Sequence, residues 1–201
     1  MKEKHTVSWR EAIQVYRQRT VVVMFFLGFS AGLPFLLVFS TLTAWLTEEG
    51  LSKSAIGFFS WIGITYSVKV FWAPVVDRFQ LPLLQKLLGQ RRSWILLAQS
   101  GIVAGLMLMA VTDPVMQLTQ LAVLGVLVAF SSATQDISID AYRIEAAVPE
   151  FQAAMSATYV FGYRLALLVA GAGSLYIAEY WSWSVTYLVM GGFAALGMLT
   201  T

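Results

Sequence analysis

Six long apolar stretches occupy most of the chain, and only short polar segments separate them. A helix needs about 20 mainly apolar residues to cross the hydrocarbon core of a bilayer, and each stretch has roughly that length. The stretches cover residues 21–46, 54–76, 93–112, 115–139, 151–177 and 183–201. This pattern predicts an all-α, polytopic membrane protein whose six transmembrane helices form one bundle over residues 20–201.

The segment before the bundle, residues 1–19, is polar. Trp9, Ile13 and Tyr16 alternate there with arginines, which predicts a short amphipathic stretch lying on the cytoplasmic surface of the membrane. A solvated tail fits the same residues equally well.

The composition agrees with a bilayer as the surroundings of the chain. Hydrophobic residues make up 58% of it and charged residues 12%, whereas about a quarter of the residues of a soluble domain are charged. The net charge of +2 gives no reason to expect a nucleic-acid partner. Because the chain has one His and no Cys, we also expect no metal site and no cofactor.

Basic residues gather on one side of the predicted bundle. The other side receives only Lys53, and two further cations, Lys69 and Arg164, lie inside predicted helices. The cations on the basic side are Lys2, Lys4, Arg10, Arg17, Arg19, Arg78, Lys86, Arg91, Arg92 and Arg143. Cytoplasmic loops carry the excess of Lys and Arg, so the N-terminus is predicted to be cytoplasmic and the protein to lie in the cytoplasmic (inner) membrane.

Small residues recur every four positions on three of the predicted helices. In lipid, such rows let helix backbones approach closely, and a moving gate would use the same residues. The rows are Gly28 and Gly32; Gly125, Ala129 and Ala133; and Ala154, Thr158, Gly162, Ala166, Ala170 and Ser174. Pro34, after the first row, predicts a kink in the first helix.

The fourth helix ends in "QDISIDAYR", residues 135–143. An Asp at a helix centre costs about 2.5 to 3.5 kcal/mol, while each large apolar residue returns only about 0.3 to 0.6 kcal/mol. Asp136 and Asp140 share one face, and Arg143 follows Asp140 at a spacing that favours an ion pair near the membrane boundary. Asp136 lies a turn deeper, beside Gln135, and needs a cation from another helix. We assign it to proton coupling or to a gate.

The cations available to Asp136 inside the membrane are Lys69 and Arg164. Arg164 lies 13 residues into the fifth helix, near the midplane, and should therefore face a polar cavity or a carboxylate. Its guanidinium suits recognition of an anionic substrate, and a structural ion pair is the other interpretation. Lys69 can also extend toward the cytoplasmic surface.

The connection after the second helix carries charges at both ends. Asp77 and Arg78 end that helix, and Arg91 and Arg92 open the next one. We expect these four residues to form a latch, a set of ion pairs that holds the helices together on the cytoplasmic side. The pattern resembles the Asp-Arg and Gly-Arg-Arg signature loop of the major facilitator superfamily, here with "FQLPLLQKLL" inserted between its halves.

Several longer sequence segments resemble one branch of that superfamily, the AmpG-type muropeptide permeases and their acetyl-coenzyme A transporter relatives. These segments are "GFSAGLPFLLV", "IGFFSWIGITYSVKVFWAPVVDRF", "RRSWILLAQ", "ATQDISIDAYRIE" and "FGYRLALLVAG". Members of the superfamily have two six-helix halves, so the resemblance implies that this chain is an N-terminal half whose C-terminal half is absent.

The resemblance also implies a function. It would be proton-driven import of N-acetylglucosaminyl-anhydro-N-acetylmuramyl peptides (anhydromuropeptides) for cell-wall recycling, by alternating access. The residues that the resemblance places along the substrate and proton pathway are Gly28, Gly32, Ala133, Gln135, Asp136, Asp140 and Arg164. We add Lys69 to this pathway because it is the other cation inside a predicted helix.

Three alternatives stay open. The closest is an acetyl-coenzyme A or other organic-anion transporter of the same superfamily. A membrane-embedded enzyme could use Asp136 and Asp140 for a metal ion, but the Gly and further acidic residues of a phosphatidyltransferase motif are missing. A sensor or assembly partner without a substrate path would carry the same buried charges as inert ion pairs.

Overall fold

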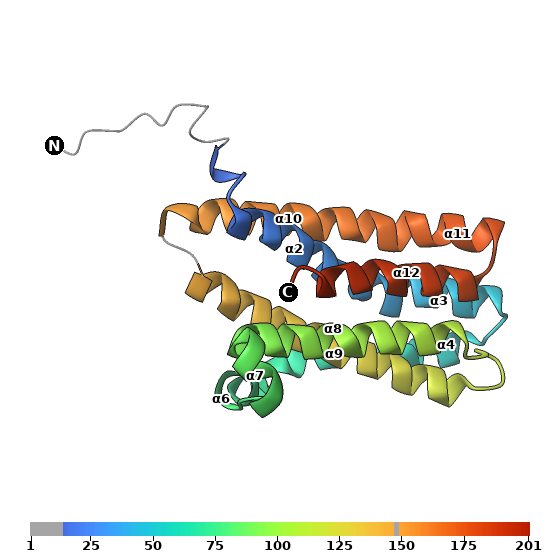
Figure 1. Ribbon diagram of the computed structural model, residues 1–201. Coiled ribbons are helices and arrows are strands. Elements are labelled where there is room, and N and C mark those ends of the chain that lie inside the picture. The colour runs from blue at the N-terminus through green and yellow to red at the C-terminus, as the bar shows by residue number, and fades with distance from the viewer. Residues whose placement is uncertain (1–13, 147–148) are drawn as a thin grey trace.

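A computed structural model describes residues 14–146 and 149–201 as a bundle of helices that run back and forth along one axis (Figure 1). Within these ranges, five helical stretches are long and apolar enough to cross a membrane: Arg19–Glu48, Lys53–Phe71, Gln90–Ala110, Leu118–Ala146 and Gln152–Tyr180. A sixth apolar helix, Trp183–Met198, has 16 residues. The predicted all-α, polytopic class is confirmed. Most of the predicted tail, residues 1–13, lies outside the described residues.

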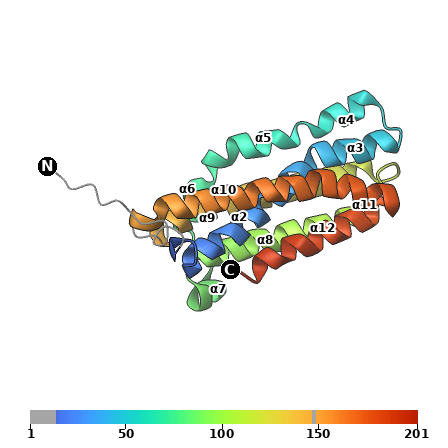
Figure 2. The same ribbon diagram turned by 90° about the horizontal axis from the view of Figure 1, so that it is seen from above.

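Several of these stretches consist of shorter elements. In chain order they are α2 (Arg19–Val38), α3 (Ser40–Glu48), α4 (Lys53–Phe59), α5 (Ile62–Ser67), η1 (Val68–Phe71), α6 (Ala73–Arg78), α7 (Pro82–Leu88), α8 (Gln90–Ala110), α9 (Leu118–Ala146), η2 (Pro149–Phe151), α10 (Gln152–Leu168), η3 (Val169–Gly173), α11 (Ser174–Tyr180) and α12 (Trp183–Met198). In Figure 2, α4 and α5 lie along one edge of the bundle, and α8 and α12 lie toward the other.

The first membrane span breaks at a residue that the sequence did not indicate. Pro34 lies inside α2, which continues through it and ends at Val38, and the kink at Pro34 stays a prediction. The break lies at Phe39, whose φ of −114° and ψ of −97° are not helical. Beside it the carbonyl of Leu37 accepts a hydrogen bond of 2.8 Å from the buried hydroxyl of Tyr187 on α12. A neighbouring helix thus supplies a donor where the backbone is irregular.

The second span is also interrupted, whereas the apolar pattern predicted one helix over residues 54–76. Its last element, α6, has Pro74 in its first turn. Proline has no N–H to donate to the carbonyl four residues earlier, so it is favoured in the first turn of a helix and costs a hydrogen bond in the interior. The span therefore ends as a short helical segment set off from α5 by η1.

Two boundaries differ from the prediction in ways that affect the charged residues. The helix predicted over residues 115–139 starts at Leu118 and continues to Ala146, so Asp140 and Arg143 lie on a regular helix. The insertion before the third span forms α7, and Gly89 separates α7 from α8 with a φ of +80°. That left-handed conformation is readily adopted by glycine and is uncommon for other residues.

The closest helix crossing joins α2 to α10. A Cβ atom on Gly28 would collide with the backbone carbonyl of Tyr159, and one on Gly32 with that of Tyr163. In the reverse direction, a Cβ on Gly162 would collide with the carbonyl of Phe25. The close approach predicted from the small-residue rows is confirmed for this pair of helices.

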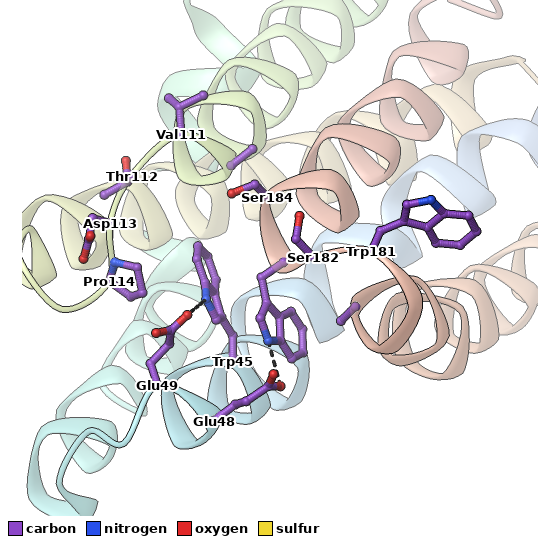
Figure 3. A pocket seen from close by; sticks show the side chains of 13 residues that line it. Trp45, Glu48, Glu49, Val111, Thr112, Asp113, Pro114, Trp181, Ser182 and Ser184 are labelled. Atoms are coloured by element: carbon purple, nitrogen blue, oxygen red, sulfur yellow. Dashed lines mark hydrogen bonds between the residues drawn. The ribbon is translucent and has the colours of Figure 1, made fainter.

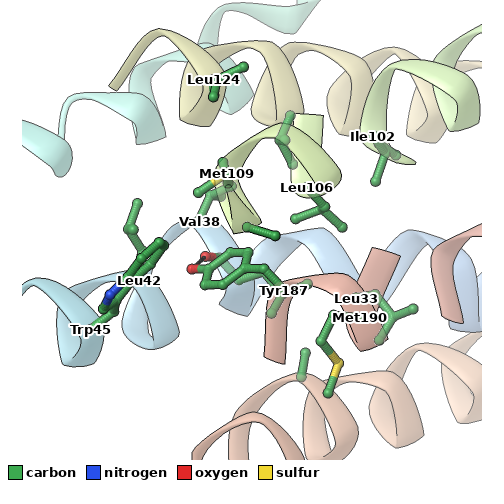
Figure 4. Packing of buried hydrophobic residues seen from close by; sticks show 14 of the residues in the cluster. Leu33, Val38, Leu42, Trp45, Ile102, Leu106, Met109, Leu124, Tyr187 and Met190 are labelled. Atoms are coloured by element: carbon green, nitrogen blue, oxygen red, sulfur yellow. Dashed lines mark hydrogen bonds between the residues drawn. The ribbon is translucent and has the colours of Figure 1, made fainter. Parts of the chain in front are cut away.

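The main apolar core lies where α2, α3, α8, α9 and α12 meet, and it extends to Ala166 of α10 and Ala170 of η3. Figure 4 shows Tyr187 of α12 among Leu42, Leu106 and Met109. Tyr187 is fully buried, and the ring of Trp45 lies 5.0 Å from its ring, centroid to centroid. The core therefore ties α12 to the first span as well as to α8.

We expect Gly28→Ala to lower the melting temperature of the purified protein by several degrees. The added methyl group must push α2 away from α10, and such overpacking costs about 1 to 3 kcal/mol. Gly192→Ala on α12 is the matched control, because a Cβ there meets no other atom within 4 Å. Equal melting temperatures for the two variants would show that the helices do not cross this closely.

Candidate functional site

An ion pair inside the membrane-spanning region joins the second and fourth spans. Lys69 Nζ, in η1, lies 3.7 Å from Asp136 Oδ2 on α9, and their side chains are 38% and 20% exposed. Of the two cations that the sequence offered to Asp136, the structure places Lys69 beside it. The second carboxylate oxygen, Oδ1, is buried and has no hydrogen-bond partner among the described residues. Asp136 therefore has one oxygen paired and one available.

Three tyrosines surround this pair. The charge of Asp136 acts on the phenol groups of Tyr66, Tyr159 and Tyr163. The hydroxyl of Tyr66 is buried and has no hydrogen-bond partner within the described part of the chain. The rings of Tyr159 and Tyr163 lie 6.3 Å apart, centroid to centroid, on α10. Together with Lys69 and Asp136, these tyrosines form what we call the Asp136 cluster.

One turn beyond Asp136, the predicted pair between Asp140 and Arg143 is confirmed. Arg143 Nη2 lies 3.4 Å from Asp140 Oδ1, and Nη1 donates a hydrogen bond of 2.7 Å to Ser156 Oγ on α10. The side chain of Asp140 is 60% exposed. The carboxylate of this pair is therefore more exposed to solvent than that of Asp136, and the hydrogen bond of Arg143 to Ser156 connects α9 to α10.

Gln135 points away from the Asp136 cluster, although it precedes Asp136 in sequence. Successive residues of a helix are about 100° apart around its axis, and Gln135 is completely buried between helices. Its side chain donates a hydrogen bond of 3.2 Å to Ser30 Oγ on α2, and Gln99 of α8 approaches the same oxygen at 3.4 Å. Ala133 is buried as well. The structure places both in helix contacts, and their part in a pathway stays a prediction.

Gly28 and Gly32 likewise lie at the crossing of α2 and α10, and a role in a pathway stays a prediction for them too.

Arg164 lies on the exposed side of α10. No carboxylate of residues 14–146 or 149–201 comes within ion-pair distance of it. It directly follows Tyr163, one of the tyrosines of the Asp136 cluster.

The latch forms through Arg91 and includes a residue that sequence reasoning missed. Arg91 Nη1 lies 2.6 Å from Asp77 Oδ1, and Nη2 lies 2.8 Å from Glu145 Oε1. Gln90 adds a hydrogen bond of 2.6 Å to the backbone carbonyl of Asp77. The insertion thus leaves the contact between α6 and α8 in place, and Glu145 extends it to α9. In the sequence, the charge of Glu145 was the one indication of this role, because its pairing with Arg91 depends on how α8 and α9 pack.

A pocket lies at the opposite end of the bundle, away from the Asp136 cluster (Figure 3). It has a volume of about 510 Å³. Trp45 and Trp183 stack 6.1 Å apart beside it, and their indole N–H groups donate to Glu49 and Glu48 at 3.2 and 2.9 Å. Both indole N–H groups are thus satisfied by glutamates at this end of the bundle.

Over residues 14–146 and 149–201, no group of three or more His, Cys, Asp or Glu side chains is placed to hold a metal ion. The candidate site consists of a pair of opposite charges with free polar atoms around it. Such an arrangement can exchange a proton, or exchange one partner for another, without a cofactor.

Comparison with known proteins decides the family. The family model described as Major Facilitator Superfamily matches residues 24–201. The chain belongs to the major facilitator superfamily. It is accordingly a multi-pass membrane protein, and the matched range includes both the Asp136 cluster and the latch.

The resemblance to AmpG-type permeases is confirmed as well. The chain is 39% identical over 179 residues to "Putative transporter AmpG 4" of Rickettsia felis. This aligned region covers 88% of this chain and 43% of that protein. It is 37% identical over 179 residues to "Anhydromuropeptide permease" of Escherichia coli K12. This aligned region covers 89% of this chain and 36% of that protein. The chain thus spans less than half the length of these relatives.

A double-mutant cycle tests the pair at the centre of the site. We expect Lys69→Gln and Asp136→Asn to be coupled by about 1 kcal/mol in the free energy of unfolding, because both side chains are partly removed from water. The cycle of Arg143→Gln with Asp140→Asn is the control, and its coupling should be about 0.5 kcal/mol or less because Asp140 is largely exposed. Coupling energies in the reverse order would contradict the site.

Proposed function

We propose that this chain is the N-terminal half of a proton-coupled permease that imports anhydromuropeptides across the cytoplasmic membrane. The observation that carries the proposal is the ion pair of Lys69 and Asp136 inside a membrane-spanning bundle of this superfamily. Intramembrane charges are expensive and usually mark substrate or proton routes. The substrate class rests on the similarity to the Escherichia coli permease.

In this proposal Asp136 carries the proton. When Asp136 is ionised it holds Lys69, and when it takes up a proton the attraction between them is lost. The second span is then free to shift relative to the fourth, which gives proton binding a mechanical effect. The free oxygen of Asp136 and the unpartnered hydroxyl of Tyr66 support this role, since both can bind water or a substrate hydroxyl.

Arg164 recognises the peptide carboxylates of the substrate. It is a guanidinium on an exposed helix face without a described counterion, and it directly follows Tyr163 of the Asp136 cluster. A second six-helix half, of the kind that the longer relatives have room for, supplies the other wall of the site. The two halves rock about the site in alternating access, with the latch closing the cytoplasmic side.

The uptake of labelled anhydromuropeptide tests the function. The chain is joined to a second six-helix half, and uptake is measured in cells with and without an imposed proton gradient. We expect gradient-dependent accumulation in the unmodified protein and at least a tenfold loss in Asp136→Asn, with exchange of labelled for unlabelled substrate retained. Glu179→Gln, an exposed carboxylate change, is the control and should leave accumulation intact.

Each failure of this experiment has its own meaning. Absence of uptake by the unmodified protein at normal expression would overturn the muropeptide substrate, and labelled acetyl-coenzyme A would be the next substrate tested. Normal accumulation in Asp136→Asn would remove Asp136 from proton coupling. Loss of exchange together with accumulation would assign Asp136 to substrate binding or folding.

The orientation is tested separately, by labelling single cysteines in intact cells. The chain contains no cysteine of its own, so Ser54→Cys and Lys86→Cys each introduce one exposed thiol at opposite ends of the bundle. With a cytoplasmic N-terminus, a membrane-impermeant maleimide should label Ser54→Cys at once and label Lys86→Cys after the cells are opened. The reverse pattern would invert the proposed orientation.

A further inference from the structure

The second arginine of the Gly-Arg-Arg signature is not part of the latch. Arg91 holds Asp77 and Glu145, whereas Arg92 has no ion pair among the described residues. Arg92 lines a cavity of about 450 Å³ together with Arg19, Thr20, Val23 and Tyr142. The start of α2, the start of α8 and the last part of α9 meet there, at the same end of the bundle as the latch.

This cavity has an excess of positive charge. Among the residues that the structure describes, two guanidinium groups line it and no carboxylate does. The first turn of α2, which begins at Arg19, contains no acidic residue, and Gln18 makes no side-chain cap. The free N–H groups of that turn add to the positive potential of the arginines.

A smaller adjoining cavity of about 240 Å³ shares Arg92 and Tyr142 with the first. Its lining includes one carboxylate, that of Glu145, which is already engaged by Arg91. The charge of Arg92 is therefore not neutralised from that side either. An anionic ligand would meet two guanidinium groups that have no ion-pair partner in the described part of the chain, and two hydroxyl groups, on Thr20 and Tyr142.

The position of the cavity selects the kind of anion. Arg19 begins an apolar membrane span, and Val22 and Phe26, which follow it on α2, are exposed hydrophobic residues. Positions 19, 22 and 26 lie on one face of a helix. A ligand whose charged end enters the cavity can thus lay an apolar tail along α2 into the bilayer. A soluble phosphate would use the arginines but leave this apolar strip unused.

We propose that the cavity between α2, α8 and α9 is a binding site for the phosphate headgroup of an anionic phospholipid. Arg19 and Arg92 hold the phosphate oxygens, because guanidinium groups bind phosphate through paired hydrogen bonds. Basic pockets between membrane helices on the cytoplasmic side are suited to such headgroups. The inference rests on the chain crossing a membrane and does not depend on the identity of the transported substrate.

Lipid titration of the purified transporter, with the second half joined, tests the site. The protein in detergent is titrated with phosphatidylglycerol, with phosphatidylcholine and with inorganic phosphate, and bound lipid is counted by native mass spectrometry. We expect saturable binding of phosphatidylglycerol and none of phosphatidylcholine. The double variant Arg19→Gln with Arg92→Gln should weaken phosphatidylglycerol binding at least tenfold, since each arginine contributes about fivefold.

The matched control removes two exposed cations from the same end of the bundle, in Arg17→Gln with Lys86→Gln. It should change binding by about twofold or less. Equal losses in the two double variants would reduce the effect to general surface charge and overturn the site. Competition by inorganic phosphate at equal concentration would overturn the lipid in favour of a soluble anion.

If the double arginine variant does not fold, Arg92→Lys and Tyr142→Phe decide the question. Arg92→Lys keeps the charge and loses the paired geometry, and Tyr142→Phe removes one hydroxyl group. Each should weaken phosphatidylglycerol binding while leaving the melting temperature in lipid-free detergent unchanged. Unchanged lipid binding in both would overturn the proposal, and this result is independent of any uptake measurement.

Discussion

The close approach of α2 to α10 is the constraint on which the rest of the bundle depends. Lipid tails are as apolar as the side chains that they touch, so helices in a membrane gain little from hydrophobicity and must gain from packing. Gly28, Gly32 and Gly162 bring the two backbones into contact. The carbonyls that rest on the first two belong to Tyr159 and Tyr163. The same crossing that holds the first and fifth spans together therefore sets where those two side chains leave α10, beside Asp136.

Irregular backbone in this bundle occurs where another helix can satisfy it. The first span breaks at Phe39, and the fifth passes through the π-helical segment η3. These two stretches lie against each other, since Thr41 Oγ1 donates a hydrogen bond of 2.8 Å to the carbonyl of Ala170. A carbonyl exposed to hydrocarbon would cost several kcal/mol. The breaks are thus tolerated as a pair, within the helices that cross most closely.

Apolar length was enough to predict the approximate spans, and small-residue spacing indicated which helices can pack closely, because both are properties of a single helix. The pair of Asp140 and Arg143 was also local, one turn apart on one face. Contacts between helices were less accessible. The sequence limited the partners of Asp136 to two cations, but the choice of Lys69 depends on how η1 lies against α9. Gln135 is fully buried between helices, and hydrophobicity does not show which side of a mostly apolar helix faces protein. Its partner Ser30 is 105 residues away.

The charges left unpaired show which surfaces of this half-bundle are unsuited to lipid. An arginine in the hydrocarbon costs about 2.5 to 3.5 kcal/mol, and Arg164 lies on the exposed side of α10 without a described counterion. Lys69 carries the same positive charge as Arg164 and cannot pair with it, and Asp136 is already paired with Lys69. The face that carries Arg164 and Tyr163 must therefore meet water or polar protein. In the proposed transporter both are present there, because the substrate cavity and the second half adjoin this face. Arg19 and Arg92 differ, since they lie where the spans begin and a lipid phosphate can reach them from the membrane itself.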